Sequence, residues 1–306
     1  MTANLISPDL ARRVRSSFET RQENIEEFIR TLVEIESPSG DEHGSRLVVD
    51  VLAKAAAQLE CVSSIERSDV PGFGQHLVIE AFPQSHTAGQ VLLVGHTDTV
   101  HELGTILQRP WRREENRIYG PGIFDMKANC AMAVEVLRTL QSLKVTPQYG
   151  VTIVLTCDEE VGSQSGWPLI ERVAKTRATR CALVMEPPAP GGRVKTGRKG
   201  TGMYSIKVEG KAAHAGLEPE KGASAILELA RQTERLHSIN QSGSGITLNL
   251  GVVRGGTRSN VVAAEAEGEI DVRFTTEGEA NQIEQLLKTL KPIDERTRVF
   301  VSGGIN

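Results

Sequence analysis

Three short runs of apolar residues constrain the fold more than any other feature of this chain. They cover residues 91–94, 151–155 and 182–185, and each is nearly free of polar side chains. Such runs are typical of strands buried on both faces of a parallel sheet. Helical patterns separate them, and the order strand, helix, strand, helix, strand predicts an α/β layer architecture for the first part of the chain.

The helices expected around this sheet follow from the spacing of apolar residues. Between the first two strands, one helical face is formed by Met126, Cys130, Val134 and Leu137. Another helix is expected from residue 168 to 173. Amphipathic helices are predicted over residues 17–33 and 44–59, with a loop signature at 37–41 between them.

The pattern changes after about residue 194. Three later segments alternate between apolar and polar residues, at 204–209, 246–250 and 269–274. With helices expected at 225–236 and 280–290 and a last strand at 298–301, this predicts an α+β unit with an antiparallel sheet. The Pro/Gly-rich stretch 187–192 is a natural hinge. We therefore predict a catalytic metal-binding domain over residues 1–194 and a lid or dimerisation domain over residues 195–306.

Composition excludes several classes of protein. A chain of 306 residues is long enough for two cores, and its net charge of -4 lacks the basic footprint of nucleic-acid binding. We expect no membrane partner, because no apolar stretch reaches the length of a signal-peptide core or a membrane span. Four cysteines without CxxC spacing, at 61, 130, 157 and 181, are interpreted as buried free thiols, which fits a reducing cytoplasm.

Residues of metal-ligand type follow each of the three apolar strands. The first strand leads to His96 and Asp98, the second to Glu159 and Glu160, and the third to Glu186. The carboxyl ends of parallel strands meet at one edge of a sheet, so these side chains should converge on one crevice. Asp125 joins them from a predicted helix start after residues 120–122, where the helix dipole favours a carboxylate.

One imidazole with several carboxylates and no thiolate suits a hydrolytic site better than a structural zinc site. Two ions could share a bridging carboxylate. Asp98 could accept the second N–H of His96 and fix its tautomer. Of the adjacent glutamates, one would bind metal and the other would take a proton from a metal-polarised water that attacks an amide carbonyl. The residues alone leave open which glutamate does which.

Each motif has a simpler interpretation when it is taken alone. His-x-Asp is usually a polar turn, Asp-Glu-Glu a solvated charge run, and Glu-Pro a strand terminator. Their joint occurrence after three buried strands of one sheet is harder to explain by packing or solubility.

These residues lie in stretches that resemble the M20 metallopeptidases, and in particular their glutamate carboxypeptidase-like branch. The stretches are GHTDTV (95–100), YGPGIFDMK (119–127), TCDEEVGS (156–163), MEPP (185–188), GRKGTGMYSIKVEGKAAHAG (197–216) and TRSNVVAAEAEGEIDVRF (257–274). They follow the family's order along nearly the whole chain. The resemblance implies a zinc-peptidase-like catalytic domain with a mixed, largely parallel sheet, followed by an α+β lid domain that forms a homodimer.

The resemblance also implies a role for each candidate residue. Four would be metal ligands: His96 and Glu186 for one ion, Glu160 for the other, and Asp125 as the bridge. Glu159 would be the general base, and Asp98 would orient His96. The ions would be zinc, with cobalt and manganese as alternatives.

Three residues of the second unit match positions near the substrate in this family. His214 would reach the partner subunit's active site and polarise the scissile carbonyl. Asn260 and Arg273 would contact a substrate carboxylate or the tetrahedral intermediate. Without the resemblance, a surface role would be the default for all three.

The family's returning segment, with a glycine-rich stretch and a last metal-binding histidine, has no counterpart before the chain ends at Asn306. We therefore expect a C-terminally truncated chain with an incomplete second metal site. Such a chain would bind one ion better than two and would have weak activity or none.

The function expected is a metal-dependent hydrolase that cleaves an amide or peptide bond next to a free carboxylate, as a carboxypeptidase or dipeptidase does. Its substrates would be small peptides or N-acyl amino acids. One alternative is an N-acyl amino acid deacylase of the acetylornithine or succinyl-diaminopimelate type. Another is a truncated, non-catalytic dimerising relative.

Overall fold

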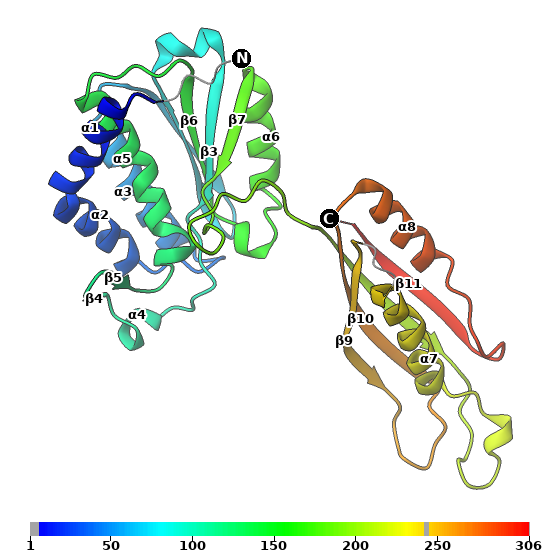
Figure 1. The fold of residues 1–306 in the computed structure, drawn as a ribbon. Helices are drawn as coiled ribbons and strands as arrows, with labels where there is room; N and C mark the ends of the chain where they lie inside the picture. Colours follow the sequence, from blue (N-terminus) through cyan, green and yellow to red (C-terminus); the bar gives the residue numbers. More distant parts are fainter. Residues whose placement is uncertain (1–5, 242–244, 306) are drawn as a thin grey trace. The chain divides into compact units, whose positions relative to one another are not determined.

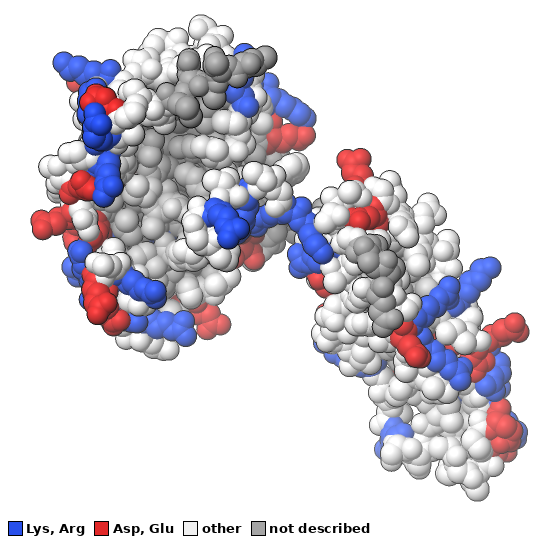
Figure 2. Space-filling model, viewed as in Figure 1, with Lys and Arg blue, Asp and Glu red and all other residues white. Residues whose placement is uncertain are grey.

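The computed structural model describes residues 6–241 and 245–305, and its chain divides into two compact units, Met1–Gly191 and Gly192–Asn306. Each unit has its own sheet (Figure 1). Each also has its own hydrophobic core. Among the described residues, no helix combines the length and the apolar character that crossing a membrane requires. On the face drawn in Figure 2, acidic and basic side chains are interspersed over both units.

The first unit is built on a five-stranded sheet with the order β1-β2-β6-β3-β7. Its strands are β1 (Val62–Val70), β2 (Gly74–Ala81), β3 (Gln90–His96), β6 (Gly150–Thr156) and β7 (Thr179–Val184). The three strands predicted from apolar runs are adjacent, with β3 parallel to both β6 and β7. The hairpin of β1 and β2 was not predicted. It pairs antiparallel with β6 and makes the sheet mixed.

Helices cover both faces of this sheet. The helices are α1 (Pro8–Thr20), α2 (Gln22–Glu34), α3 (Glu42–Ala57), α4 (Thr105–Gln108), α5 (Ala128–Ser142) and α6 (Gly166–Thr176). The larger core lies between one face of the sheet and α2, α3 and α5, whereas α6 packs on the other face against Val78, Leu92 and Val154. The α/β layer architecture is thus confirmed. A small two-stranded sheet, β4 (Arg112–Glu114) with β5 (Arg117–Tyr119), lies in the loop before α5.

Three expectations for this unit were wrong in detail. The helix predicted over residues 17–33 is two helices, α1 and α2, which meet at Arg21. The chain turns at this residue. The Arg21 guanidinium forms an ion pair with Glu135 of α5 and donates a 2.7 Å hydrogen bond to the hydroxyl of Thr139 on the same helix. Strand β7 is not buried on both faces, because it is an edge strand whose residues from Arg180 to Val184 are exposed.

The third correction concerns the cysteines, which were expected to be buried. All four are free thiols, but only Cys130 and Cys157 are buried. Cys61 is half-buried, and Cys181 is exposed because it lies on the edge strand β7.

The second unit is an antiparallel four-stranded sheet with two helices, as the alternating pattern predicted. Its strands have the order β11-β8-β10-β9 and its elements are β8 (Gly200–Glu209), α7 (Ala225–His237), β9 (Thr247–Gly255), β10 (Glu265–Phe274), α8 (Glu277–Lys288) and β11 (Arg298–Ile305). Alternation explains this packing, since Ala266 and Ile270 of β10 are buried in the core while Glu267 and Glu269 between them face solvent.

Candidate metal centre

The ends of three parallel strands bring the candidate residues together. Strand β3 ends at His96, and Glu186 follows the end of β7 by two residues. Beyond the end of β6, the short turn η3 (Glu159–Val161) carries Glu159 and Glu160. Because β3 lies between β6 and β7, these groups meet at one edge of the sheet.

Three side chains form a compact cluster with the composition of a metal site. Ligand atoms of His96, Asp125 and Glu186 all lie within 4.8 Å of one another. The Nε2 atom of His96 lies 3.1 Å from Asp125 Oδ1 and 3.5 Å from Glu186 Oε1. Among the described residues, this is the one group of three or more such side chains that meets this criterion.

Asp125 reaches the cluster from irregular backbone, and the expectation that it opens a helix was wrong. It lies in the turn η2 (Ile123–Lys127) with φ -125° and ψ 95°, and α5 begins only at Ala128. The dipole argument therefore does not apply to it. Buried neighbours fix its position instead: the sulfur of Met126 accepts the His96 backbone N–H at 3.3 Å, and the buried Lys127 ammonium donates to the Ile35 carbonyl.

The other nitrogen of His96 is oriented by Asp98, mainly through its backbone. His96 Nδ1 lies 2.9 Å from the Asp98 carbonyl oxygen and 3.4 Å from its carboxylate. The carboxylate accepts three other hydrogen bonds, from the Ser39 hydroxyl at 2.6 Å and from the backbone N–H groups of Glu159 and Glu160 at 3.2 and 3.1 Å. Asp98 thus connects the end of β3 to the turn that carries both glutamates.

The two glutamates lie differently with respect to the cluster. Neither glutamate is a member of the compact group of ligand atoms, but the Glu159 carboxylate lies 4.0 Å from His96 Nε2. Burial is the main cause that raises the pKa of both carboxyl groups, and the negative charge of Asp125 adds to it. Both glutamates therefore sit where negative charge is already concentrated.

This charge also acts on His96. Burial by itself would lower the pKa of the imidazole, but hydrogen bonds with Asp98 and Glu186, together with the charges of Asp98 and Glu159, raise it to about 11. The buried imidazole and the carboxylates around it form a set of metal ligands, and a divalent cation would neutralise the negative charge of these carboxylates. The residues present therefore fit a metal of the zinc, manganese or cobalt type.

In the second unit, the structure places His214 beside Asn260 but puts Arg273 elsewhere. The loop that carries His214 pairs with the loop that carries Asn260. A β-bridge joins His214 to Val261, and the Ala215 N–H donates a 3.0 Å hydrogen bond to the Asn260 carbonyl. Both side chains are exposed. Arg273 lies near the opposite end of β10, eight residues from Glu265, a separation of roughly 26 Å along a strand. There its guanidinium bonds to Asp271 at 3.0 Å.

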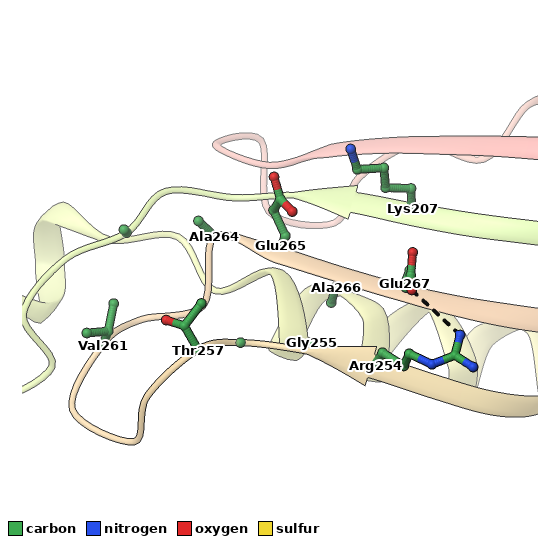
Figure 3. Close-up of a pocket in the computed structure, with 11 residues that line it drawn as sticks. Lys207, Arg254, Gly255, Thr257, Val261, Ala264, Glu265, Ala266 and Glu267 are labelled. Carbon is green, nitrogen blue, oxygen red and sulfur yellow. Dashed lines mark ion pairs between the residues drawn. The ribbon is translucent and has the colours of Figure 1, made fainter.

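A groove of about 440 Å³ adjoins the His214 loop in the second unit (Figure 3). It lies where β8 and β9 end and β10 begins, and its charged lining residues are Lys207, Arg254, Glu265 and Glu267. Arg254 pairs with Glu267 at 3.7 Å, so part of the charge in the groove is already balanced. The metal-type cluster lies in the other unit, at the open ends of strands.

Two residues that support the loop of Glu159 and Glu160 were not predicted from the sequence: His76 contacts the loop directly, and Ser39 contacts Asp98, which in turn binds the loop. Ser39 binds Asp98 from the loop after α2, and His76 of β2 binds the backbone N–H of Cys157 at 3.2 Å. For Ser39 the sequence indicates only a loop. His76 gave no signal, because its strand was not predicted.

Comparisons with known proteins agree with this architecture. The family pattern described as Peptidase dimerisation domain matches residues 196–292, and that of Peptidase family M28 matches residues 77–214. Carboxypeptidase G2 of Pseudomonas sp. (strain RS-16) is 28% identical over 271 residues, which cover 88% of this chain and 63% of the relative. Acetylornithine deacetylase of Klebsiella pneumoniae (strain 342) is 31% identical over 227 residues, 69% of this chain and 57% of the relative. This chain thus spans less than two thirds of the length of either protein.

Solved structures share the fold. Aminopeptidase PepT from Bacillus cereus ATCC 10987 superposes with a TM-score of 0.71 at 23% identity, over 92% of this chain and 77% of that one. The M20 family metallo-carboxypeptidase Sso-CP2 from Sulfolobus solfataricus gives a TM-score of 0.62 at 16% identity with the same coverage. In its fold, its cluster and its relatives, the chain is similar to the metal-dependent peptidases and amidohydrolases. Within this class the chain is similar to the M20 peptidases, and residues 196–292 of its second unit match the peptidase dimerisation domain.

Proposed function

We propose that the protein is a metal-dependent hydrolase that cleaves an amide or peptide bond next to a free carboxylate, in the manner of a carboxypeptidase or dipeptidase. The observation that carries the proposal is the cluster of His96, Asp125 and Glu186 with the Glu159 carboxylate 4.0 Å from His96. The similarity to carboxypeptidase G2 over 88% of this chain supports the same class of reaction.

In this proposal His96, Asp125 and Glu186 would hold one divalent ion, and Glu160 together with Asp125 would hold a second. Zinc is the first choice, with cobalt or manganese as alternatives. When bound, such ions supply Lewis-acid activation of water and of the substrate carbonyl. Asp98 holds the turn of the glutamates and orients His96, through the hydrogen bonds described above.

Glu159 is the proposed general base. It is not one of the clustered ligand atoms, so its oxygens are available for a proton, and burial raises the pKa of its carboxyl group. A raised pKa brings a carboxylate closer to the range in which it can both take a proton from water and pass it to the leaving nitrogen.

The second unit is proposed to form a homodimer and to provide His214, Asn260 and Arg273 for the substrate. The match to a peptidase dimerisation domain supports the dimer, and the pairing of the His214 and Asn260 loops supports a joint role for these two. Arg273 would act separately, on an anionic group, since it lies at the other end of the sheet. A cytoplasmic location completes the proposal and is supported by the four free cysteines.

A deacylase of small N-acyl amino acids is the second candidate. It is favoured by the 31% identity to an acetylornithine deacetylase over 69% of this chain. Both candidates use the same cluster and differ in the acyl group of the substrate. Parallel assays with N-acetyl amino acids and with dipeptides separate them.

The test of the proposal substitutes the base. In Glu159→Gln we expect kcat to fall by about 10²–10⁴-fold, because the amide cannot take a proton, while zinc binding measured by calorimetry is retained. Glu60→Gln, the same change at an exposed glutamate, is the matched control. A wild-type chain that binds no divalent metal, or a Glu159→Gln variant with full turnover, would refute the proposal.

A further inference from the structure

His76 lies in the middle of a buried polar chain that does not belong to the metal-type cluster. It projects from β2 and is 4% exposed. Its Nδ1 atom is 3.2 Å from the backbone nitrogen of Cys157, and its Nε2 atom is 3.1 Å from the Ser165 hydroxyl oxygen. One imidazole of the sheet therefore contacts both the start and the end region of the loop 157–166.

The partners of His76 determine where its proton lies. The Cys157 backbone N–H can only donate, so Nδ1 must accept. The Ser165 hydroxyl donates its proton to Asp158 Oδ2 at 2.7 Å, so it must accept from Nε2–H. His76 is therefore a neutral imidazole that carries its proton on Nε2. Burial, which lowers its pKa, favours the same neutral form.

Two buried carboxylates hold the remainder of this loop. Asp158, which is 1% exposed, accepts the N–H groups of Ser165 at 2.7 Å and Gly166 at 3.1 Å. Asp98 accepts those of Glu159 and Glu160. The loop is thus fixed at its start by His76, in its middle by Asp98 and at its end by Asp158, with Ser165 joining His76 to Asp158.

We propose that His76 is a positioning residue that fixes the loop 157–166 and thereby keeps the Glu159 carboxylate beside His96. The inference rests on the proposed function for the role of Glu159. An apolar side chain of the same size would leave the Cys157 N–H and the Ser165 hydroxyl without this partner in a buried place, where an unmade hydrogen bond is costly. A side chain that only fills the space of His76 therefore cannot replace its two hydrogen bonds.

A different role for this group, a cysteine–histidine nucleophile, does not fit the structure. Cys157 is fully buried, and its burial raises the pKa of the thiol to about 12. Its Sγ atom is 3.5 Å from His76 Nδ1, but that nitrogen already accepts the backbone N–H. A nucleophilic thiolate needs exposure and a lowered pKa, and Cys157 has neither.

Three substitutions separate the two hydrogen bonds of His76. In His76→Asn, the amide oxygen can take the place of Nδ1 and accept the Cys157 N–H. In His76→Gln, the amide nitrogen can take the place of Nε2 and donate to Ser165. His76→Leu provides neither. Each variant of the full chain is compared with wild type for kcat, KM, zinc affinity and hydrogen exchange of the peptide that contains residues 157–166.

For His76→Leu we expect kcat to fall by about 10–100-fold with KM and zinc affinity within about twofold, and faster exchange confined to residues 157–166. His76→Asn should restore most of the kcat and most of the protection from exchange at residues 157–166, because its amide oxygen keeps the hydrogen bond to the Cys157 N–H. Unchanged exchange at 157–166 in His76→Leu, or faster exchange spread evenly over the first unit, would overturn the proposal.

The exchange measurement keeps the two proposals apart. If the wild-type chain turns over none of the assayed amides, the proposed function fails, but the local exchange of His76→Leu still tests the positioning role. If wild type is active and His76→Leu has the same kcat, the positioning role fails alone.

Discussion

At the scale of single residues, the candidate site concentrates negative charge around one imidazole. Asp125 and Glu186 approach the same nitrogen of His96, while Asp98 holds the opposite nitrogen through its backbone carbonyl. Carboxylates at such distances repel one another unless a cation lies between them. The site is therefore organised for a positive charge that its own side chains do not supply in full.

Removing one charge from the cluster should weaken cation binding. We expect Asp125→Asn to lower the affinity for zinc at least about tenfold, because the amide keeps the size of the side chain but loses its charge and ligand strength. Isothermal titration of the variant beside wild type measures this. Asp9→Asn, at an exposed aspartate of α1, should bind as wild type does, and equal affinities for Asp125→Asn and wild type would contradict the assignment.

His76 should make the stability of the protein depend on pH. Burial lowers its folded pKa below the ordinary value of 6.5, against the charges of Asp158 and Asp98, which raise it. The unfolded chain therefore binds a proton that the folded chain does not, and the free energy of unfolding should fall as the pH drops below 6.5.

The matched variant for this effect is His76→Asn, which has no titrating group at the position. Urea unfolding of both proteins above and below pH 6.5 gives the slopes. The wild type should lose more stability than the variant on acidification. Parallel pH profiles for the two proteins would show that His76 makes no such contribution.

At the scale of elements, the buried face of α5 connects the core to the site. Cys130, Val134 and Leu137 are fully buried on this face, and Met126, just before the helix, contacts the backbone of His96. The predicted helical spacing was correct for Cys130, Val134 and Leu137 but wrong for Met126, because the helix starts only at Ala128. The site thus depends on the turn η2 before the helix as much as on the helix itself.

The packing of α5 can be tested with two neighbouring residues. Leu137→Ala should lower the free energy of unfolding by about 2–5 kcal/mol, because it leaves a cavity in the core. Val136→Ala, on the exposed side of the same helix, should cost less than about 1 kcal/mol. Chemical denaturation of both variants gives the comparison, and similar losses for the two would mean that this helix does not pack as described.

At the scale of the whole molecule, two cores have separate sheets. The hydrophobic cluster of the second unit is formed by β8, β9, β10, β11, α7 and α8, all from residues beyond 199. A unit that contains its whole core should fold without the rest of the chain.

We therefore expect residues 192–306, expressed alone, to fold cooperatively and to form dimers. Circular dichroism with thermal melting tests the folding, and analytical ultracentrifugation gives the mass in solution. A folded monomer at every concentration would contradict the proposed dimer but not the independence of the core. An unfolded chain would contradict that independence.

The sequence by itself determined the class of each layer and the chemistry of the strand ends. Apolar runs and alternation reflect which faces a sheet buries, so β3, β6 and β8 could be predicted from local patterns. His96 and Glu186 were expected in one crevice because parallel strands end at the same edge of a sheet, and their ligand atoms lie within 4.8 Å of each other.

Only the tertiary structure decided the exposure of β7, the break at Arg21 and the pairing of β2 with β6. These features depend on which strand lies at the edge of the sheet and on which distant side chains contact a turn. A local sequence pattern does not predict either. For the same reason His76 was missed. Its function depends on hydrogen bonds to residues more than eighty positions away, which only the folded chain brings within reach.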